Sequence, residues 1–288
     1  MTPDKRIHKT ATKRGKKTLL RQRTVNDFAD ALDWALIPGE YDSVNGSSSV
    51  SGSHGFTGTK SADDYRDMLR EGWTDGVEGV EGLDGLSTDA SDKIEFVRNV
   101  GGAFPIVPAY LSGAPDAMLR PVPQAADSVR GLTLVIDASF NCGVNSDEVI
   151  DYARSVMRLL AWLQAEGIET AVYATISMQH RGQRLLYTCP IREAGDVMMP
   201  ERIASICHPS FLRRAWFALV EREHAEFSLP YADLCNHCYG YPQTVTTHEL
   251  SQAIPEAYSI ILLPKVGSGD PDAAVREAYT LKIKTGDA

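Results

Sequence analysis

An apolar run followed at once by a long helical pattern limits the choice of folds more than any other part of this sequence. Residues 132–139 read LTLVIDAS, and a continuous run of this kind is typical of a strand that is buried on both faces. Residues 146–167 then repeat apolar side chains at three- and four-residue spacing, and Gly167 stands where such a helix would end. A buried strand followed by an amphipathic helix predicts an α/β protein.

Further segments continue the alternation of strand and helix. Strand-like runs occupy 169–178, 184–191 and 258–266, and helical patterns occupy the stretch from Pro200 past the break at His208-Pro209 and residues 270–283. Short strands or extended segments are expected at 94–100, 104–111 and 118–124. We therefore expect residues 94–288 to form a mostly parallel, Rossmann-type sheet with helices on both faces.

The first 24 residues differ from the rest in charge. They contain nine lysines and arginines against Asp4 alone, although the whole chain has a net charge of -9. The basic residues are Lys5, Arg6, Lys9, Lys13, Arg14, Lys16, Lys17, Arg21 and Arg23. With few apolar residues to bury, residues 1–24 are expected to form a disordered, mobile arm. Such an arm suits DNA or RNA phosphates; the alternative is a solvated tail or one that docks on the protein's own acidic body.

Residues 25–93 are expected to form a small helical region with flexible linkers. The first helix is capped by Thr24 or Asn26 and is followed by a Ser/Gly-rich linker. The second starts at a capping box of Ser61 and Asp64, before an acidic, Gly-rich loop. The apolar stripe of this second helix comprises Tyr65, Met68, Leu69 and Trp73.

Asp137 closes the buried strand and opens the segment DASFNCG, which resembles the first metal-binding segment of von Willebrand factor A domains. The resemblance implies a Mg²⁺ site at Asp137, Ser139 and Asn141, with Asn141 in the place of a serine. The alternative is structural, with the carboxylate accepting hydrogen bonds from N–H groups of the turn. In that family a later strand ends in another Asp near the ion, whereas the last strand here ends in Pro264-Lys265, where an ammonium would repel a cation. Asp270 could take the place of that Asp only if its loop folded back.

Cys235 and Cys238 have the C-x-x-C spacing of half a zinc site. The remaining candidate ligands form no second pair by spacing; they are Cys207, His208, His224, His237 and His248. We favour reduced thiols, because five cysteines in a chain of 288 residues do not indicate a disulfide framework. Zinc bound by Cys235, Cys238 and two other ligands is the alternative, and our expectation is that the protein has no cofactor.

Known catalytic patterns are poorly matched. Residues 55–61, GFTGTKS, lack the spacing of a Walker loop, and the chain has neither a G-x-G-x-x-G motif after a strand nor a G-x-S-x-G motif. Ser139, His208 and Asp137 could be combined into a hydrolase triad, but a chain of this length offers many such combinations. We expect a protein that is not an enzyme.

Four blocks together resemble a family of uncharacterised tailed-bacteriophage proteins with a degenerate von Willebrand A-like domain. They lie at 56–76, 106–121, 132–139 and 208–221, and the resemblance spans about residues 56–280. It implies a phage origin and a setting in the host cytoplasm, with a virion-associated setting as the alternative. A partner from the phage or the host is implied in the same way.

These observations combine into one expected function. We expect a non-enzymatic phage accessory protein that binds a protein partner through its α/β domain and nucleic acid through its basic arm. The alternatives are a metal-dependent adhesion module, a structural component of the virion and, less favoured, a hydrolase. No apolar stretch approaches the roughly 18 residues of a membrane span, so no membrane partner is expected.

Overall fold

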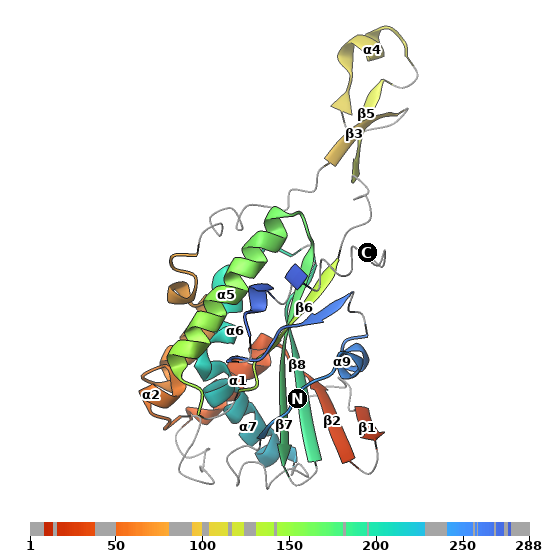
Figure 1. Cartoon of the computed structure of the whole chain (residues 1–288). Coiled ribbons are helices and arrows are strands. Elements are labelled where there is room, and N and C mark those ends of the chain that lie inside the picture. The colour runs from red at the N-terminus through yellow and green to blue at the C-terminus, as the bar shows by residue number, and fades with distance from the viewer. Residues whose placement is uncertain are drawn as a thin grey trace.

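The computed structural model is a mixed α/β structure (Figure 1). It describes residues 9–13, 16–37, 50–80, 94–99, 104–114, 117–123, 131–140, 143–180, 183–194, 196–227, 241–255, 257, 259–267, 269–273 and 276–277. The strands are β1 (Lys9–Lys13), β2 (Lys16–Gln22), β3 (Ile94–Asn99), β4 (Phe104–Pro105), β5 (Met118–Pro123), β6 (Leu132–Asp137), β7 (Thr170–His180), β8 (Gln183–Arg192), β9 (Tyr241–Pro242) and β10 (Ile260–Leu262). The helices are α1 (Val25–Ala35), α2 (His54–Thr57), α3 (Ala62–Glu71), the short η1 (Thr74–Gly76), α4 (Val107–Leu111), α5 (Ser146–Ala165), α6 (Pro200–Cys207), the π-helix η2 (Phe211–Trp216), α7 (Phe217–Phe227) and α9 (Thr247–Ala253).

The large sheet has the strand order β1-β2-β8-β7-β6-β10, and β9 pairs with β7 outside this order. Three of the four pairings that join β2, β8, β7, β6 and β10 are parallel, and the exception joins β7 to β8. These two strands follow each other without a crossover helix, which requires antiparallel pairing. The predicted α/β fold with a mostly parallel sheet is confirmed. Most of the helix expected at 270–283 lies outside the described residues.

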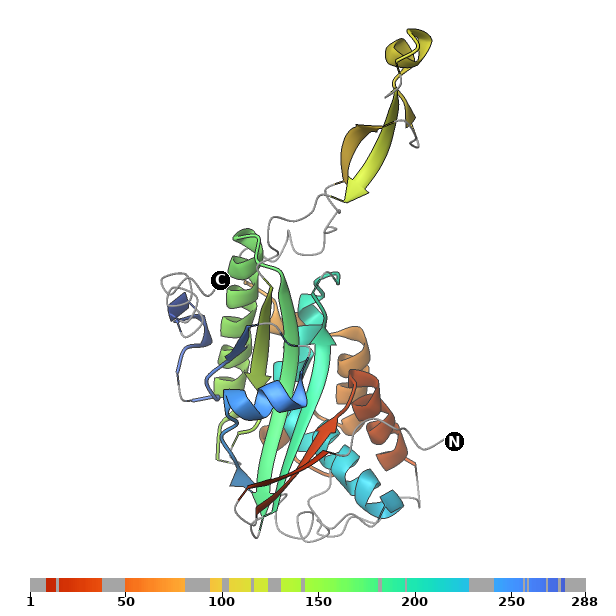
Figure 2. The ribbon, with the colours of Figure 1, turned by 90° about the vertical axis from the view of Figure 1, so that its right-hand side faces the viewer.

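Helices cover both faces of the sheet, but unequally. Figure 2 shows α9 on one side of the sheet and α5 with most other helices on the opposite side. Alternate residues of β6 pack on opposite faces of the sheet. Leu134 and Ile136 belong to the larger core cluster, whereas Val135 belongs to a smaller one with Leu250 and Ile254. β6 is therefore buried on both faces, as its continuous apolar run predicts.

The N-terminal helices pack into the larger cluster. Phe28 of α1 contacts Phe211 of η2, with ring centroids 4.8 Å apart, and Tyr65 of α3 is fully buried. α3 begins at the predicted capping box, in which Asp64 N donates to Ser61 Oγ at 3.0 Å and Ser61 N donates to Asp64 Oδ2 at 2.9 Å. The helical region expected before the α/β domain thus shares its core.

A buried arginine attaches the segment before α3 to η2. The Arg214 guanidinium donates from Nε to Thr59 Oγ1 at 2.8 Å, and from Nη2 to Thr57 Oγ1 at 2.9 Å and to the Gly52 carbonyl at 3.0 Å. Such contacts supply the acceptors that a buried guanidinium requires. The GFTGTKS segment therefore has a structural role, in which its threonines hold η2.

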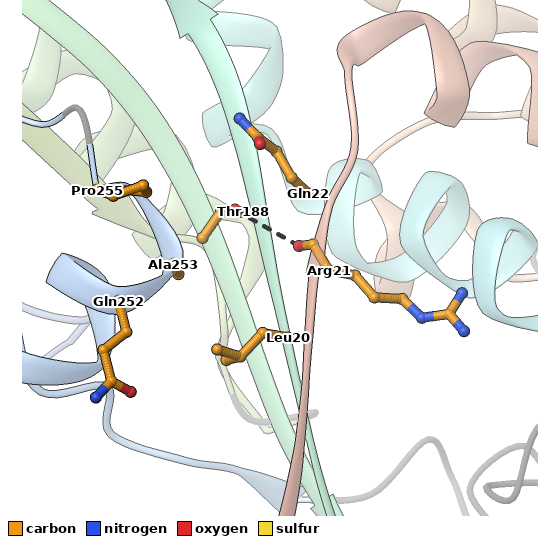
Figure 3. Close-up of a pocket in the computed structure, with 7 residues that line it drawn as sticks. All are labelled: Leu20, Arg21, Gln22, Thr188, Gln252, Ala253 and Pro255. Atoms are coloured by element: carbon orange, nitrogen blue, oxygen red, sulfur yellow. Dashed lines mark hydrogen bonds between the residues drawn. The ribbon is translucent and has the colours of Figure 1, made fainter. Parts of the chain in front are cut away.

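The expectation of a mobile arm over residues 1–24 is corrected at residues 16–22, which form β2. This strand pairs in parallel with β8, so that Leu20 lies opposite Leu186. Leu20 joins the smaller core cluster, and Figure 3 shows Leu20 and Arg21 pointing in different directions from β2. Burial of Leu20 gives the segment an apolar contact that a solvated arm would lack.

The side chain of Arg21 contributes to a buried ionic cluster under the sheet. Arg21 Nη1 forms an ion pair with Glu223 Oε2 on α7, and Arg23 binds Glu223 Oε1 through Nε at 2.8 Å and Nη2 at 2.7 Å. Tyr187 of β8 donates its hydroxyl to Glu223 Oε2 at 2.5 Å. Burial and the Glu223 carboxylate raise the pKa of Tyr187 well above its ordinary value. Arg21 and Arg23, which were predicted to contact nucleic-acid phosphates, both pair with Glu223 in this structure.

A separate three-stranded antiparallel sheet has the order β3-β5-β4. α4 connects β4 to β5, where residues 104–111 were expected to be extended. This expectation is corrected, because residues 107–111 form a short helix with Pro108 in its first turn. Proline suits that position, since the N–H that it lacks would have no partner within the helix.

Replacing Glu223 with Gln should destabilise the fold. The substitution keeps the side-chain size but leaves two guanidiniums facing a neutral amide, and the free energy of unfolding should fall by about 3–5 kcal/mol in urea titrations. Glu166→Gln, at the exposed end of α5, is the matched control and should change stability by no more than about 0.5 kcal/mol. Equal stability of the two variants would contradict a stabilising role for the cluster.

Candidate functional site

Asp137 lies at the carboxyl end of β6, where α/β sheets commonly bind ligands. Its carboxylate is only 1% exposed. Ser139 N donates to Asp137 Oδ1 at 2.9 Å, and Lys265 Nζ lies 3.7 Å from Asp137 Oδ2. The expected position of Lys265 beside Asp137 is confirmed. The bond from Ser139 N is the contact anticipated by the structural interpretation of this carboxylate.

The hydroxyl of Ser139 is also engaged within the protein. Its Oγ accepts a hydrogen bond from Ser177 N on β7 at 2.7 Å. Burial raises the pKa of Asp137, while Lys265 and the bond from Ser139 oppose that rise. Asn141 lies outside the described residues. The structure thus brings together Asp137, Ser139 and a lysine ammonium, which disfavours a divalent cation between them.

A series of hydrogen bonds links Ser139 to α9 through Ser177 and Arg184. Arg184 donates from Nε to Ser177 Oγ at 2.7 Å, from Nη1 to Glu249 Oε1 at 2.5 Å and from Nη2 to the Thr244 carbonyl at 2.9 Å. Glu249 also closes the N-terminal capping box of α9 with Thr246. No local pattern in the sequence indicates this connection, because Arg184 and Glu249 are 65 residues apart.

The proposed zinc ligands are not assembled in the described part of the chain. Cys235, Cys238 and His237 fall outside it, and the side chain of His224 is likewise not described. Within the described ranges there is no group of three or more Cys, His, Asp or Glu residues that could hold a metal ion. Cys207 is buried, and burial raises the pKa of its thiol to about 12, so it is a protonated core residue.

His208 is packed as a neutral core residue. Its ring stacks on Tyr65 with centroids 5.5 Å apart and meets Trp73 edge-on at 4.7 Å. Its Nδ1 accepts a hydrogen bond from Ser210 N at 3.1 Å. Burial, with a smaller effect of Arg214, lowers the pKa of His208 to about 3. These contacts give His208 a structural role. A catalytic triad would require hydrogen bonds that link His208 with Asp137 and Ser139, and the described part of the chain shows none.

The basic N-terminal residues fall into three groups. Lys5, Arg6 and Arg14 lie outside the described residues. Arg21 and Arg23 belong to the Glu223 cluster. The backbone positions of Lys9, Lys13, Lys16 and Lys17 form the β1–β2 hairpin at the edge of the large sheet, with Lys13 paired to Lys16 and Thr12 to Lys17.

α4 presents an apolar surface that sequence analysis missed. Val107, Tyr110 and Leu111 are 59%, 64% and 80% exposed, and none of the five residues of α4 is buried. Their spacing of i, i+3 and i+4 places them on one helical face. That spacing in IVPAYL is the sequence signal from which this face could have been predicted.

Among the described residues, every helix is too short or too polar to cross a lipid bilayer. One family model, described as Domain of unknown function (DUF7192), matches residues 10–284. No curated protein and no solved structure matches the chain.

Replacing Asp137 with Asn should change how stability depends on pH. Because the pKa of Asp137 is raised above its ordinary value of 3.8, the folded protein holds this proton more tightly than the unfolded chain. The resulting stabilisation is complete below pH 3.8 and is lost as the pH rises through the raised pKa. The Asn variant should therefore gain stability relative to the wild type between about pH 4 and about pH 7, as measured by urea unfolding.

Asp151→Asn, on the exposed face of α5, is the control and should follow the wild type at both pH values. Added MgCl₂ at about 10 mM should leave the melting temperature unchanged, because a ligand that does not bind the folded state cannot stabilise it. The opposite result, in which the wild type becomes more stable than the Asn variant as the pH rises, would contradict the prediction. It would mean that Lys265 lowers the pKa of Asp137 by more than burial raises it.

Proposed function

The chain belongs to the family described as Domain of unknown function (DUF7192), and since that description assigns no activity, we propose a function from the geometry. The protein is a non-enzymatic accessory protein that binds a partner protein through α4. The observation that carries this proposal is the exposed face of Val107, Tyr110 and Leu111.

The form of α4 suits insertion into an apolar groove. Side chains at i, i+3 and i+4 are the anchors by which short amphipathic helices bind such grooves. Pro108 fixes the first turn, and Tyr110 N donates to the Ile106 carbonyl at 2.9 Å. Ile106 N in turn donates to the Ala117 carbonyl at 2.7 Å, which ties α4 to the start of β5. A helix held in this way loses little conformational entropy on binding.

A protein groove explains this surface better than a lipid surface does. Helices that lie on membranes combine an apolar face with lysines or arginines that attract anionic lipids. Residues 104–114 contain no charged residue. An aromatic side chain between two aliphatic ones matches the composition of protein interface centres.

The arrangement of Asp137, Ser139 and Lys265 at the end of β6 favours binding of a partner protein over metal-dependent chemistry. Lys265 already places a positive charge next to Asp137, so an adhesion mechanism that relies on Mg²⁺ at this point would first have to displace it. The similarity to tailed-bacteriophage proteins suggests a phage or host protein as the partner, in the host cytoplasm or the virion.

Photo-crosslinking tests the α4 contact. A benzophenone side chain in place of Tyr110 should form one discrete adduct with another protein in the cells where the protein is made, because that side chain is expected to enter the groove. The adduct should disappear when Val107 and Leu111 are both changed to Ser. The control position is Tyr241 on β9, which is 72% exposed. The same adduct at Tyr241, adducts only between copies of this chain, or an adduct that survives the double substitution would contradict the proposal.

Nucleic-acid association is the second candidate function, and the register of the β1–β2 hairpin favours it. Lys13 and Lys16 lie directly opposite each other, and Lys17 is next to Lys16. Like charges directly opposite in an antiparallel pair destabilise it, and a phosphate backbone would relieve that repulsion. This proposal uses Lys9, Lys13, Lys16 and Lys17, together with Lys5, Arg6 and Arg14.

Salt dependence tests the nucleic-acid proposal. Changing both Lys13 and Lys16 to Gln should weaken binding to a labelled DNA duplex, and the slope of log affinity against log salt should fall by about one for each lost phosphate contact. The double control Lys60→Gln with Arg158→Gln removes the same charge from two exposed positions elsewhere. Equal slopes for both double variants would contradict a specific role of the hairpin. Repeating the assay with single-stranded RNA separates the two kinds of nucleic acid.

A further inference from the structure

A cavity of about 250 Å³ lies where the end of β8 meets the first turn of α6. Its apolar lining comprises Ile191, Val197, Met199 and Ile203. Pockets for drug-sized ligands usually measure roughly 300–1,000 Å³. A cavity below that range suits one or two side chains of a larger partner.

One of the two arginines in the lining is fixed by the protein. Arg192 donates from Nε and Nη2 to the Asp196 carbonyl at 3.0 and 2.7 Å, and from Nη1 to the Thr170 carbonyl. The Asp196 carboxylate accepts a hydrogen bond from Glu193 N at 3.2 Å, within its own turn. Arg192 therefore shapes the cavity. Because Asp196 also lies in the lining, the two arginines and one aspartate leave a net charge of +1.

The second arginine, Arg202, is available to an incoming acceptor. It is partly exposed on the first turn of α6, and its Nη1 lies 4.0 Å from Met199 Sδ. A thioether is a weak acceptor, and among the described residues no other hydrogen bond or ion pair is recorded for this guanidinium. Its remaining N–H groups form the planar fork that binds a carboxylate through two parallel hydrogen bonds.

The surface around the cavity extends the apolar contact. Val197 is 57% exposed and Met199 is 46% exposed, and both also line the cavity. A small free acid would fill the cavity and leave this border uncovered. A peptide chain would cover both, so the arrangement favours a macromolecular ligand.

We propose that this cavity binds a short segment of a partner protein in which an apolar side chain is followed by a carboxylate. The apolar side chain occupies the space between Ile191 and Ile203, and the carboxylate binds Arg202. This site goes beyond the contact made by α4, because it lies on other elements and selects for charge as well as for apolar surface.

Peptide titrations followed by methyl NMR test this site on the full chain. The probe is the blocked tetrapeptide Gly-Leu-Glu-Gly, and the reporters are the methyl groups of Met199 and Ile203. Saturable shifts of both signals are expected. Blocked Gly-Leu-Gln-Gly and Gly-Ser-Glu-Gly should each bind about fivefold or more weakly, because each lacks one of the two recognition elements.

Variants of Arg202 complete the test. Arg202→Gln should weaken Gly-Leu-Glu-Gly about fivefold and abolish its preference over the Gln peptide, whereas Arg202→Lys should be intermediate because it keeps the charge without the fork. Urea unfolding of both variants verifies the fold. Leu111→Ser should leave peptide binding unchanged, which separates this site from the α4 contact. The proposal is overturned if Gly-Leu-Glu-Gly gives no saturable shift or if Arg202→Gln binds it as tightly as the wild type.

Discussion

The Glu223 carboxylate joins three parts of the chain that the sequence keeps far apart. Arg21 and Arg23 come from β2 and its end, Tyr187 comes from β8, and Glu223 lies on α7. A buried carboxylate is costly unless cations and hydrogen-bond donors surround it, and here two guanidiniums and a phenol do so. The position of β2 in the sheet and the position of α7 beneath it are therefore coupled. Leu20, on the other side of β2, joins the smaller core cluster, so β2 contributes to the ionic cluster on one face and to apolar packing on the other.

Local patterns predicted the parts of the fold that depend on neighbouring residues. The apolar run of β6, the stripe of α5 and the capping box of Ser61 with Asp64 are all read within one element, and the structure has each of them. The structure of the basic segment could not be predicted from its neighbouring residues. Nothing near Arg21 in sequence indicates that its countercharge is Glu223, and without that partner nine basic residues indicate a solvated arm.

The candidate site shows the same division. Asp137 and Lys265 each follow a predicted strand, and this predicted that they lie side by side. In the structure Lys265 Nζ lies 3.7 Å from Asp137 Oδ2. The link from Ser177 through Arg184 to Glu249 depends on how α9 lies on the sheet, which no local pattern specifies. α4 was missed for another reason, because residues 104–111 were expected to be extended, although Pro108 suits a helical first turn. The features that could engage a partner are therefore mostly those that only the tertiary structure reveals.

The parallel pairing of β2 with β8 has a consequence for how the protein is made. Arg23 and Glu223 are 200 residues apart, so the N-terminal strand leaves the ribosome long before its ionic partner exists. At synthesis rates of about 5–20 residues per second, that delay is roughly 10–40 s. During this interval Arg21 and Arg23 cannot form their ion pairs with Glu223. The ionic contacts between β2 and α7 therefore form late, as contacts of long sequence separation, after most of the chain has been synthesised.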